Sequence, residues 1–296
     1  MKIKLIMQKQ KLSTIVAGTM NWGAWGKKLS ETEMAKRIEF CLENNVSSFD
    51  HADIYGGYTT EAEFGKAFTA SKIDRKNVQF ITKCGIQSVA DNRSTTIKHY
   101  NYSRAHIIKS VDNSLQNLQT DYIDVVLLHR PSPLLDAHEV ADTVFELIRD
   151  GKIMEFGLSN FSPLQTELLR EKIKVEYNQI QFSATNLDAM SDGSLDYMQS
   201  NHIHAMAWNP LGSTFKSNDE KSIRVKAISD KLGLKYNVSA EVILFAWIQK
   251  HPANILPVFG TTDFDRIRNL AKSSEVDLQL EDYFAIWEAN LGRKVD

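Results

Sequence analysis

The sequence predicts a single (β/α)8 barrel of parallel strands, with residues 1–296 forming one domain. Three observations favour this fold. Strand and helix patterns alternate about eight times, which is typical of parallel strands joined by helical crossovers. No linker or change in composition interrupts the alternation, and 296 residues suit such a barrel. An open, doubly wound sheet is the alternative, but no Gly-x-Gly-x-x-Gly follows the first predicted strand.

The first half of the chain supplies four predicted barrel strands. A capping box, Ser30 to Glu33, opens the first helix, and Ser103 caps a later one. Residues 122–128 are nearly all apolar, as expected for a strand buried on both faces. In order, we expect strands over 12–19, 47–50, 78–82 and 122–128, separated by helices over 31–42, 60–68 and 104–118. Residues 3–8 are expected to add a short strand that forms an N-terminal hairpin with the first.

The second half continues the alternation. One helix ends at Gly151, a common helix stop, and another begins at Ser162-Pro163 with proline in its first turn. In order, we expect a helix over 137–149, a strand over 153–158, a helix from 163, a strand over 175–181, a short helix over 195–200, a strand over 204–208, helices over 223–232 and 239–250, and a strand over 255–259. Helices over 263–271 and 281–289 close the chain as two extra C-terminal helices.

The composition excludes several classes of function. A net charge of -2 and a pI near 6.5 leave no basic field for nucleic acid. No apolar run reaches the roughly 20 residues that span a bilayer, so no membrane partner is expected. The two cysteines, Cys41 and Cys84, form no disulfide framework, which favours a cytoplasmic protein. We expect a monomer or a small homo-oligomer.

Four polar residues lie where a barrel enzyme places its chemistry. Asp50, Lys83 and His129 each follow an apolar strand, and Tyr55 comes five residues after Asp50. In barrel enzymes the active site lies at the carboxyl ends of the strands. We therefore expect these four side chains to meet at one mouth of the barrel.

Together the four residues predict a proton donor aimed at a carbonyl. A tyrosine has a reference pKa of about 10, and a unit charge about 4 Å away is worth roughly three pKa units before desolvation subtracts. Lys83 is therefore expected to lower the pKa of Tyr55, Asp50 to keep Lys83 protonated, and His129 to orient the substrate oxygen. A carbonyl that gains a proton must also gain a hydride, which side chains cannot supply, so a cofactor is implied.

Residues 49–56, FDHADIYG, resemble the signature segment of the aldo-keto reductases, and the form with His51 is similar to a bacterial branch. The resemblance extends over nearly the whole chain. It implies a (β/α)8 barrel whose catalytic tetrad is Asp50, Tyr55, Lys83 and His129. It also implies an NADP(H)-dependent oxidoreductase that reduces aldehydes or ketones to alcohols, with a small carbonyl compound as substrate.

The same resemblance implies the cofactor contacts. Ser159, Asn160 and Gln179 are similar to the residues that hold the nicotinamide carboxamide. The segment 208–213, WNPLGS, resembles the one that stacks under the ring and wraps the pyrophosphate. The run from Gly260 to Arg266 resembles the adenosine 2′-phosphate site, which favours NADPH over NADH. The implied contacts are Thr19, Met20, Asp50, Ser159, Asn160, Gln179, Trp208, Asn209, Pro210, Leu211, Gly212, Ser213, Gly260, Thr261, Thr262, Arg266 and Asn269.

Two tryptophans follow the first strand among glycines. Trp22 and Trp25 are expected to form walls of a substrate pocket together with Tyr55 and His129. Two other functions stay open. One is a non-catalytic NADPH-binding regulatory subunit, similar to the channel-associated members of the family. The other is a metal-dependent barrel hydrolase that uses His51, Asp53 and His129, but too few ligands are present, so no metal is expected.

Overall fold

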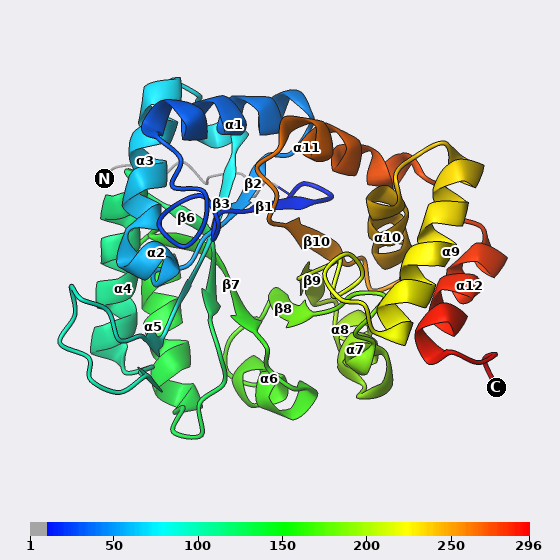
Figure 1. The fold of residues 1–296 in the computed structure, drawn as a ribbon. Helices are drawn as coiled ribbons and strands as arrows, with labels where there is room; N and C mark the ends of the chain where they lie inside the picture. Colours follow the sequence, from blue (N-terminus) through cyan, green and yellow to red (C-terminus); the bar gives the residue numbers. More distant parts are fainter. Residues whose placement is uncertain (1–10) are drawn as a thin grey trace.

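A closed barrel of parallel strands forms the centre of the computed structural model, which describes residues 11–296 (Figure 1). This confirms the predicted (β/α)8 fold. The barrel strands follow one another in chain order, and the ring closes where Val16 lies opposite Val258. The strands are β1 (Val16–Gly18), β2 (Ser48–Asp50), β3 (Gln79–Cys84), β6 (Ile123–Leu128), β7 (Ile153–Ser159), β8 (Tyr177–Gln181), β9 (His204–Trp208) and β10 (Leu256–Phe259).

Helices cover the outside of the barrel, and their first turns carry the predicted caps. Ser30 and Glu33 form a reciprocal capping box at α1, and Ser162 and Gln165 form another at α6. Within the described residues, no helix is long and apolar enough to cross a bilayer. The helices are α1 (Glu31–Glu43), α2 (Tyr55–Tyr58), α3 (Thr60–Ser71), α4 (Arg104–Leu118), α5 (Ala137–Arg149), α6 (Pro163–Arg170), α7 (Asp188–Ser191), α8 (Ser194–Ser200), α9 (Glu220–Tyr236), α10 (Ala240–Gln249), α11 (Phe264–Ala271) and α12 (Leu280–Leu291), with 3-10 turns η1 (Arg75–Asn77) and η2 (Lys272–Glu275).

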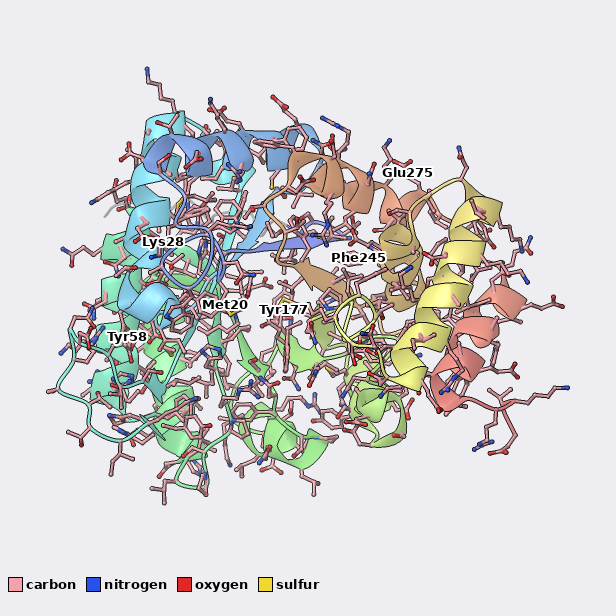
Figure 2. All side chains as sticks on the ribbon, viewed as in Figure 1. Met20, Lys28, Tyr58, Tyr177, Phe245 and Glu275 are labelled. Carbon is pink, nitrogen blue, oxygen red and sulfur yellow. The ribbon has the colours of Figure 1, made fainter. Side chains whose placement is uncertain are left out.

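The hydrophobic core has an inner and an outer layer. The inner layer is a cluster of buried side chains from six of the eight barrel strands, and Tyr177 lies near the centre of the view in Figure 2. The outer layer fills the space between the strands and the helices. On the right of Figure 1, α9, α10 and α12 pack together, and Trp247 donates to the backbone oxygen of Tyr283 at 3.0 Å. The inner layer consists of Val16, Ile81, Val125, Leu127, Tyr177, Met206 and Val258.

The observed elements differ from the expected ones mainly at short segments. The first strand covers three residues rather than 12–19, and α9 is longer than expected. The sequence did not predict the antiparallel pair β4 (Ile86–Gln87) and β5 (His99–Tyr100), nor the one-turn helices α2 and α7. Elements of two to four residues show no hydrophobic period, so sequence patterns cannot reveal them. The expected strand over residues 3–8 lies outside the described residues.

Candidate active site

Three of the four residues expected at the barrel mouth lie at the ends of neighbouring strands, and the fourth lies in the loop region after β2. Asp50 is the last residue of β2, Lys83 lies near the end of β3, and His129 directly follows β6. Tyr55 begins α2, and the turn after it depends on Gly56, whose φ is 64°. A Cβ atom on Gly56 would lie 2.4 Å from the Thr60 hydroxyl oxygen. Only glycine fits this left-handed position beside Thr60, so Gly56 fixes the turn that follows the tyrosine.

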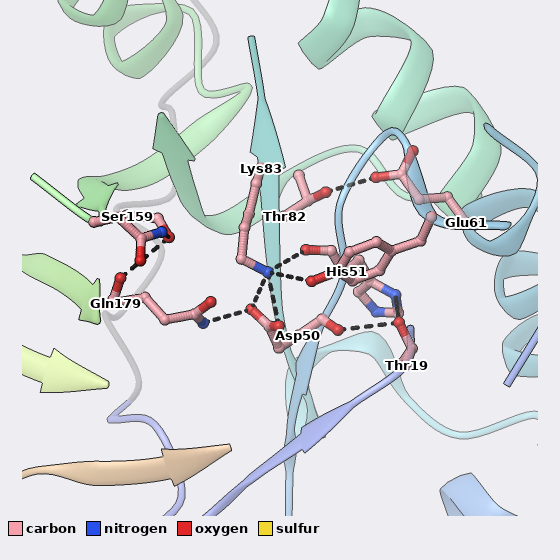
Figure 3. Close-up of polar contacts among 10 residues, drawn as sticks. Thr19, Asp50, His51, Glu61, Thr82, Lys83, Ser159 and Gln179 are labelled. Carbon is pink, nitrogen blue, oxygen red and sulfur yellow. Dashed lines mark hydrogen bonds and ion pairs between the residues drawn. The ribbon is translucent and has the colours of Figure 1, made fainter. Parts of the chain in front are cut away.

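Lys83 is the hub of the site (Figure 3). Its Nζ atom donates to both carboxylate oxygens of Asp50 at 2.7 Å, to the backbone oxygen of His51 at 2.8 Å and to the hydroxyl oxygen of Tyr55 at 3.1 Å. A lysine ammonium has three N–H groups and no acceptor, so two of these four oxygens share one N–H group. The Tyr55 oxygen must therefore accept from Lys83, and the hydroxyl hydrogen of Tyr55 is left for another acceptor.

The pKa of Tyr55 differs from the expectation. Burial raises it above 10.0, the Lys83 ammonium lowers it by less, and Asp50 raises it further. The prediction of a lowered pKa for Tyr55 was therefore wrong. Removal from water destabilises the phenolate more than Lys83, which is already paired with Asp50, stabilises it. Burial alone would lower the pKa of Lys83, but Asp50 and then Tyr55 raise it above 10.5, so the ammonium persists. At neutral pH both groups carry their protons.

His129 contributes a neutral imidazole. Its ring is nearly buried and stands edge-on to Tyr55, with 6.2 Å between ring centroids. Burial, then Lys83 and Arg130, lower the pKa of His129 well below 6.5. The Nδ1 atom has no hydrogen-bond partner among the described residues. A neutral imidazole keeps one N–H group, which can donate to a substrate oxygen without adding positive charge.

A chain of hydrogen bonds links the predicted nicotinamide residues to the catalytic ones. Trp208 Nε1 donates to Asn160 Oδ1 at 2.9 Å, and Asn160 Nδ2 donates to the Ser159 hydroxyl at 2.8 Å. That hydroxyl donates to the backbone oxygen of Gln179 at 3.1 Å, and Gln179 Nε2 donates to Asp50 at 2.9 Å (Figure 3). The fold thus brings residues from β2, β7, β8 and β9 into one connected set.

The turn after β9 has a left-handed backbone at two positions. Asn209 has φ 52° and Gly212 has φ 53°. A Cβ atom on Gly212 would lie 2.0 Å from Thr185 Oγ1, so only glycine fits there. The backbone N–H of Ser213 is already donated to Thr185 Oγ1 at 2.9 Å. The residues predicted to stack on nicotinamide or wrap a pyrophosphate are the last residue of β9 and this turn: Trp208, Asn209, Pro210, Leu211, Gly212 and Ser213.

A hollow of about 570 Å³ lies between the loop after β1 and the loop after β10. The predicted residues Gly260, Thr261, Thr262 and Arg266 all line it, whereas Asn269 is exposed on α11 and does not. The guanidinium of Arg266 makes two hydrogen bonds to the Glu241 carboxylate, at 2.8 and 3.1 Å. The expected phosphate site is therefore open, but its arginine already has an anionic partner.

The two tryptophans of the β1 loop separate into different roles. Trp22 is fully buried against Phe49 and Phe64, with ring centroids 6.3 and 5.9 Å away. Its assignment as a pocket wall was therefore wrong, because the ring fills the core between β2 and α3. Trp25 is 49% exposed, and its ring centroid lies 6.1 Å from that of Tyr55. Of the two tryptophans, Trp25 is the one whose ring lies beside the ring of Tyr55.

Thr19 also differs from its predicted role. The residue is fully buried, and its hydroxyl contacts the Asp50 backbone oxygen at 3.0 Å and His51 Nδ1 at 2.9 Å. A cofactor contact through this hydroxyl was therefore a wrong prediction, since the group is used to brace the end of β2. Met20 is exposed at the mouth, near the centre of the view in Figure 2.

The alternative metal site does not form. In residues 11–296, no three histidine, cysteine, aspartate or glutamate side chains gather in a way that could hold a metal ion. His51 faces Thr19 and the ring of Phe64, and burial, then Lys83 and Arg75, lower its pKa to about 3. The hydrolase hypothesis with His51, Asp53 and His129 as ligands is therefore wrong.

Arg130 is a site residue that the sequence analysis missed. Its guanidinium carbon lies 5.7 Å from the centroid of the Trp208 ring, and its charge lowers the pKa of both Tyr55 and His129. Its position directly after His129 was the available signal. The arginine therefore places a positive charge near Tyr55 and His129.

The comparisons with known proteins agree with this geometry. The Aldo/keto reductase family model matches residues 14–290. The oxidoreductase YcsN of Bacillus subtilis is 38% identical over 286 residues, covering 95% of each chain. The 6-dehydroglucose reductase of Agrobacterium fabrum is 34% identical over 293 residues, covering 98% of each chain.

A solved structure shares the fold at lower identity. The aldo-keto reductase of Klebsiella pneumoniae in complex with NADPH superposes with a TM-score of 0.77 at 19% identity, covering 93% of this chain and 90% of that one. The barrel, the family model over 14–290 and the relatives above 30% identity lead to one conclusion. This chain belongs to the aldo-keto reductase family.

Proposed function

We propose that this protein is an NADP(H)-dependent reductase that converts aldehydes or ketones to alcohols. The observation that carries the proposal is the hydrogen bond from Lys83 Nζ to the Tyr55 oxygen. Because the lysine can only donate, the tyrosine hydrogen is available to a substrate oxygen at the barrel mouth. The relative from Agrobacterium fabrum is named for the reduction of 6-dehydroglucose, which supports a small carbonyl compound as substrate.

The residues present fit a nicotinamide dinucleotide. Trp208 offers a partly exposed aromatic face and bonds the Asn160 amide, which is linked through the Ser159 hydroxyl to Gln179. This set suits a flat ring with a carboxamide. Gly212 packs directly against Thr185 and Ser183, where no side chain fits, and so fixes the turn that is expected to carry the pyrophosphate. The 570 Å³ hollow at Arg266 suits the adenosine end. When bound, the cofactor supplies the hydride.

The side chains of this protein handle the proton. His129, as a neutral donor, and Tyr55 hold the substrate oxygen between them. Tyr55 gives its hydrogen to that oxygen as negative charge develops there. Lys83, kept protonated by Asp50, then stabilises the phenolate that remains. Burial raises the pKa of Tyr55, so the phenol keeps its proton at neutral and mildly alkaline pH.

The test replaces one phenol at a time. Tyr55→Phe is expected to lose about 10²–10⁴-fold in kcat for aldehyde reduction, the usual contribution of a positioned acid, and to keep NADPH binding. Tyr58→Phe is the matched control, because this phenol lies in the same short helix and bonds Ser88 rather than Lys83. Its turnover should stay near that of the unmodified protein. Turnover retained in Tyr55→Phe would disprove the role of the phenol.

The same assay distinguishes the non-catalytic alternative. A regulatory NADPH-binding subunit would quench its tryptophan fluorescence on titration with NADPH but turn over no aldehyde or ketone in a broad panel. Measurable turnover that depends on Tyr55 would exclude that role as the sole function.

A further inference from the structure

The hollow beside β10 contains more positive charge than the predicted arginine. Three basic side chains line it: Lys27 from the loop after β1, Arg37 from α1 and Arg266 from α11. Two carboxylates also line it, Glu33 and Asp263, and each is used in capping a helix, α1 and α11 respectively. The basic side chains come from three parts of the chain that only the folded barrel brings together. What each of them already bonds to decides which one can recognise an anion.

Two of the three are occupied. Arg37 donates through Nε to the backbone oxygen of Thr262 at 3.0 Å and through NH1 to that of Glu33 at 2.9 Å, so it fastens α1 to the loop after β10. Arg266 forms a two-bond pair with Glu241. An anion can gain full benefit from Arg266 only by competing with that carboxylate.

Lys27 is different. Its ammonium makes no hydrogen bond or ion pair with any residue in the described part of the chain, and the side chain is exposed at the rim of the hollow. Its backbone is nonetheless fixed, because its N–H donates to the Asn21 oxygen at 2.7 Å. The close turn needs Gly26, where a Cβ atom would lie 2.3 Å from the same oxygen. A rigid turn therefore presents an unpaired, flexible ammonium to the hollow.

We propose that Lys27 is the residue through which this protein distinguishes a dinucleotide with a 2′-phosphate from one without it. The inference rests on the proposed function, since it assigns the adenosine end of the cofactor to this hollow. A lysine acts on phosphate as a movable point charge, and a phosphate monoester carries about 1.5 to 2 negative charges at pH 7. Arg266 then assists, to the extent that Glu241 releases it.

Gly260 offers a way to move the charge without removing it from the hollow. Its position lines the same space, its backbone is not left-handed, and a Cβ atom there would meet only Asn21 Nδ2, at 3.4 Å. That is an ordinary contact. A lysine at position 260 can therefore be accommodated, and its side chain would start from the opposite wall.

The experiment uses adenosine fragments, so it needs neither nicotinamide nor turnover. Isothermal titration calorimetry measures the affinity of the full-length protein for adenosine 2′,5′-bisphosphate and for 5′-AMP. Lys27→Met is expected to weaken the bisphosphate about tenfold, the size of one charge-assisted hydrogen bond, and to leave 5′-AMP unchanged. Lys28→Met is the control, because this neighbouring lysine is exposed but does not line the hollow. The double variant Lys27→Met/Gly260→Lys should recover most of the lost affinity.

Three results would overturn the inference. If Lys27→Met leaves the bisphosphate affinity unchanged, or if it weakens both fragments equally, Lys27 does not recognise the 2′-phosphate. If the unmodified protein binds the two fragments equally, this inference fails while the proposed reductase function stands. If it binds neither fragment, the adenosine site itself is misplaced, and both the inference and the cofactor assignment fail.

Discussion

Removing the charge of Asp50 should destabilise the whole protein, not only the active site. The Asp50 and Lys83 side chains are 4% and 1% exposed, and Lys83 Nζ lies 2.7 Å from each carboxylate oxygen. Asp50→Asn would leave the ammonium buried without its counter-charge. Breaking a buried pair from one side costs about 3–5 kcal/mol. The expected pKa of Lys83 then falls, because burial is no longer opposed by the carboxylate.

The loss can be measured by thermal and urea denaturation at pH 7. A chain of 296 residues has an unfolding entropy of about 0.6 kcal/mol/K, so Asp50→Asn should lower Tm by roughly 5–8 °C. Asp230→Asn is the matched control. Asp230 pairs with Lys226 at the same 2.7 Å, but the two side chains are 51% and 50% exposed. Exposed pairs of this kind are worth about 0.3–0.5 kcal/mol, so Tm should shift by less than about 1 °C.

A double variant makes the reasoning refutable. Asp50→Asn/Lys83→Met removes both charges while methionine fills part of the space of the lysine stem. It should be more stable than Asp50→Asn alone, because no unpaired charge remains buried. Two results would contradict this. The stability losses of Asp50→Asn and Lys83→Met could simply add in the double variant, or Asp50→Asn could lose no more stability than Asp230→Asn. Either result would mean that Asp50 and Lys83 do not form a buried, mutually dependent ion pair.

The remaining predictions concern burial at two other positions. Histidine in the unfolded chain takes up a proton below about pH 6.5, whereas His51 in the native protein stays neutral down to about pH 3. The unfolded state therefore gains stability from protonation as the pH falls below about 6.5, and the free energy of unfolding decreases. Urea denaturation at pH 7 and pH 5 should therefore show a smaller acid-induced loss in His51→Gln than in the unmodified protein, and equal losses would contradict the burial argument. Trp22→Ala should cost about 3–5 kcal/mol by emptying a core site, while Trp25→Ala, at a half-exposed ring beside Tyr55, should cost less than about 1 kcal/mol and change KM for the carbonyl substrate. Similar stability losses in the two variants would refute the separation of their roles.

Most of the fold could be predicted from local pattern. The capping box at Ser30, the helix start at Ser162-Pro163, the apolar strand before His129 and the helix stop at Gly151 each depend on a few neighbouring residues. Such signals are readable because the chemistry of a cap or a buried strand is carried by adjacent residue types. The pair β4 and β5 was not predicted, because two-residue strands are too short to show a hydrophobic period and are stabilised by pairing with each other.

The candidate site also has features that the sequence predicted and features that it did not. The order of Asp50, Tyr55, Lys83 and His129 along the chain was enough to expect a shared mouth, since all strands of a parallel barrel end on one face. The interaction partners of the site residues could not be predicted from the sequence. Glu241 beside Arg266 and Arg130 over Trp208 join segments that are far apart in sequence.

The residue types at the strand ends are local features of the sequence, and they predicted the barrel, the family and Tyr55 as a candidate proton donor. Packing placed Trp22 in the core and Trp25 outside it, raised the pKa of Tyr55 rather than lowering it, and left Lys27 alone among the hollow's three cations without a partner in the described chain. The physical reason is that exposure to water and the distance to the nearest opposite charge belong to the packed chain. Neither quantity is a property of a residue or of its neighbours in sequence.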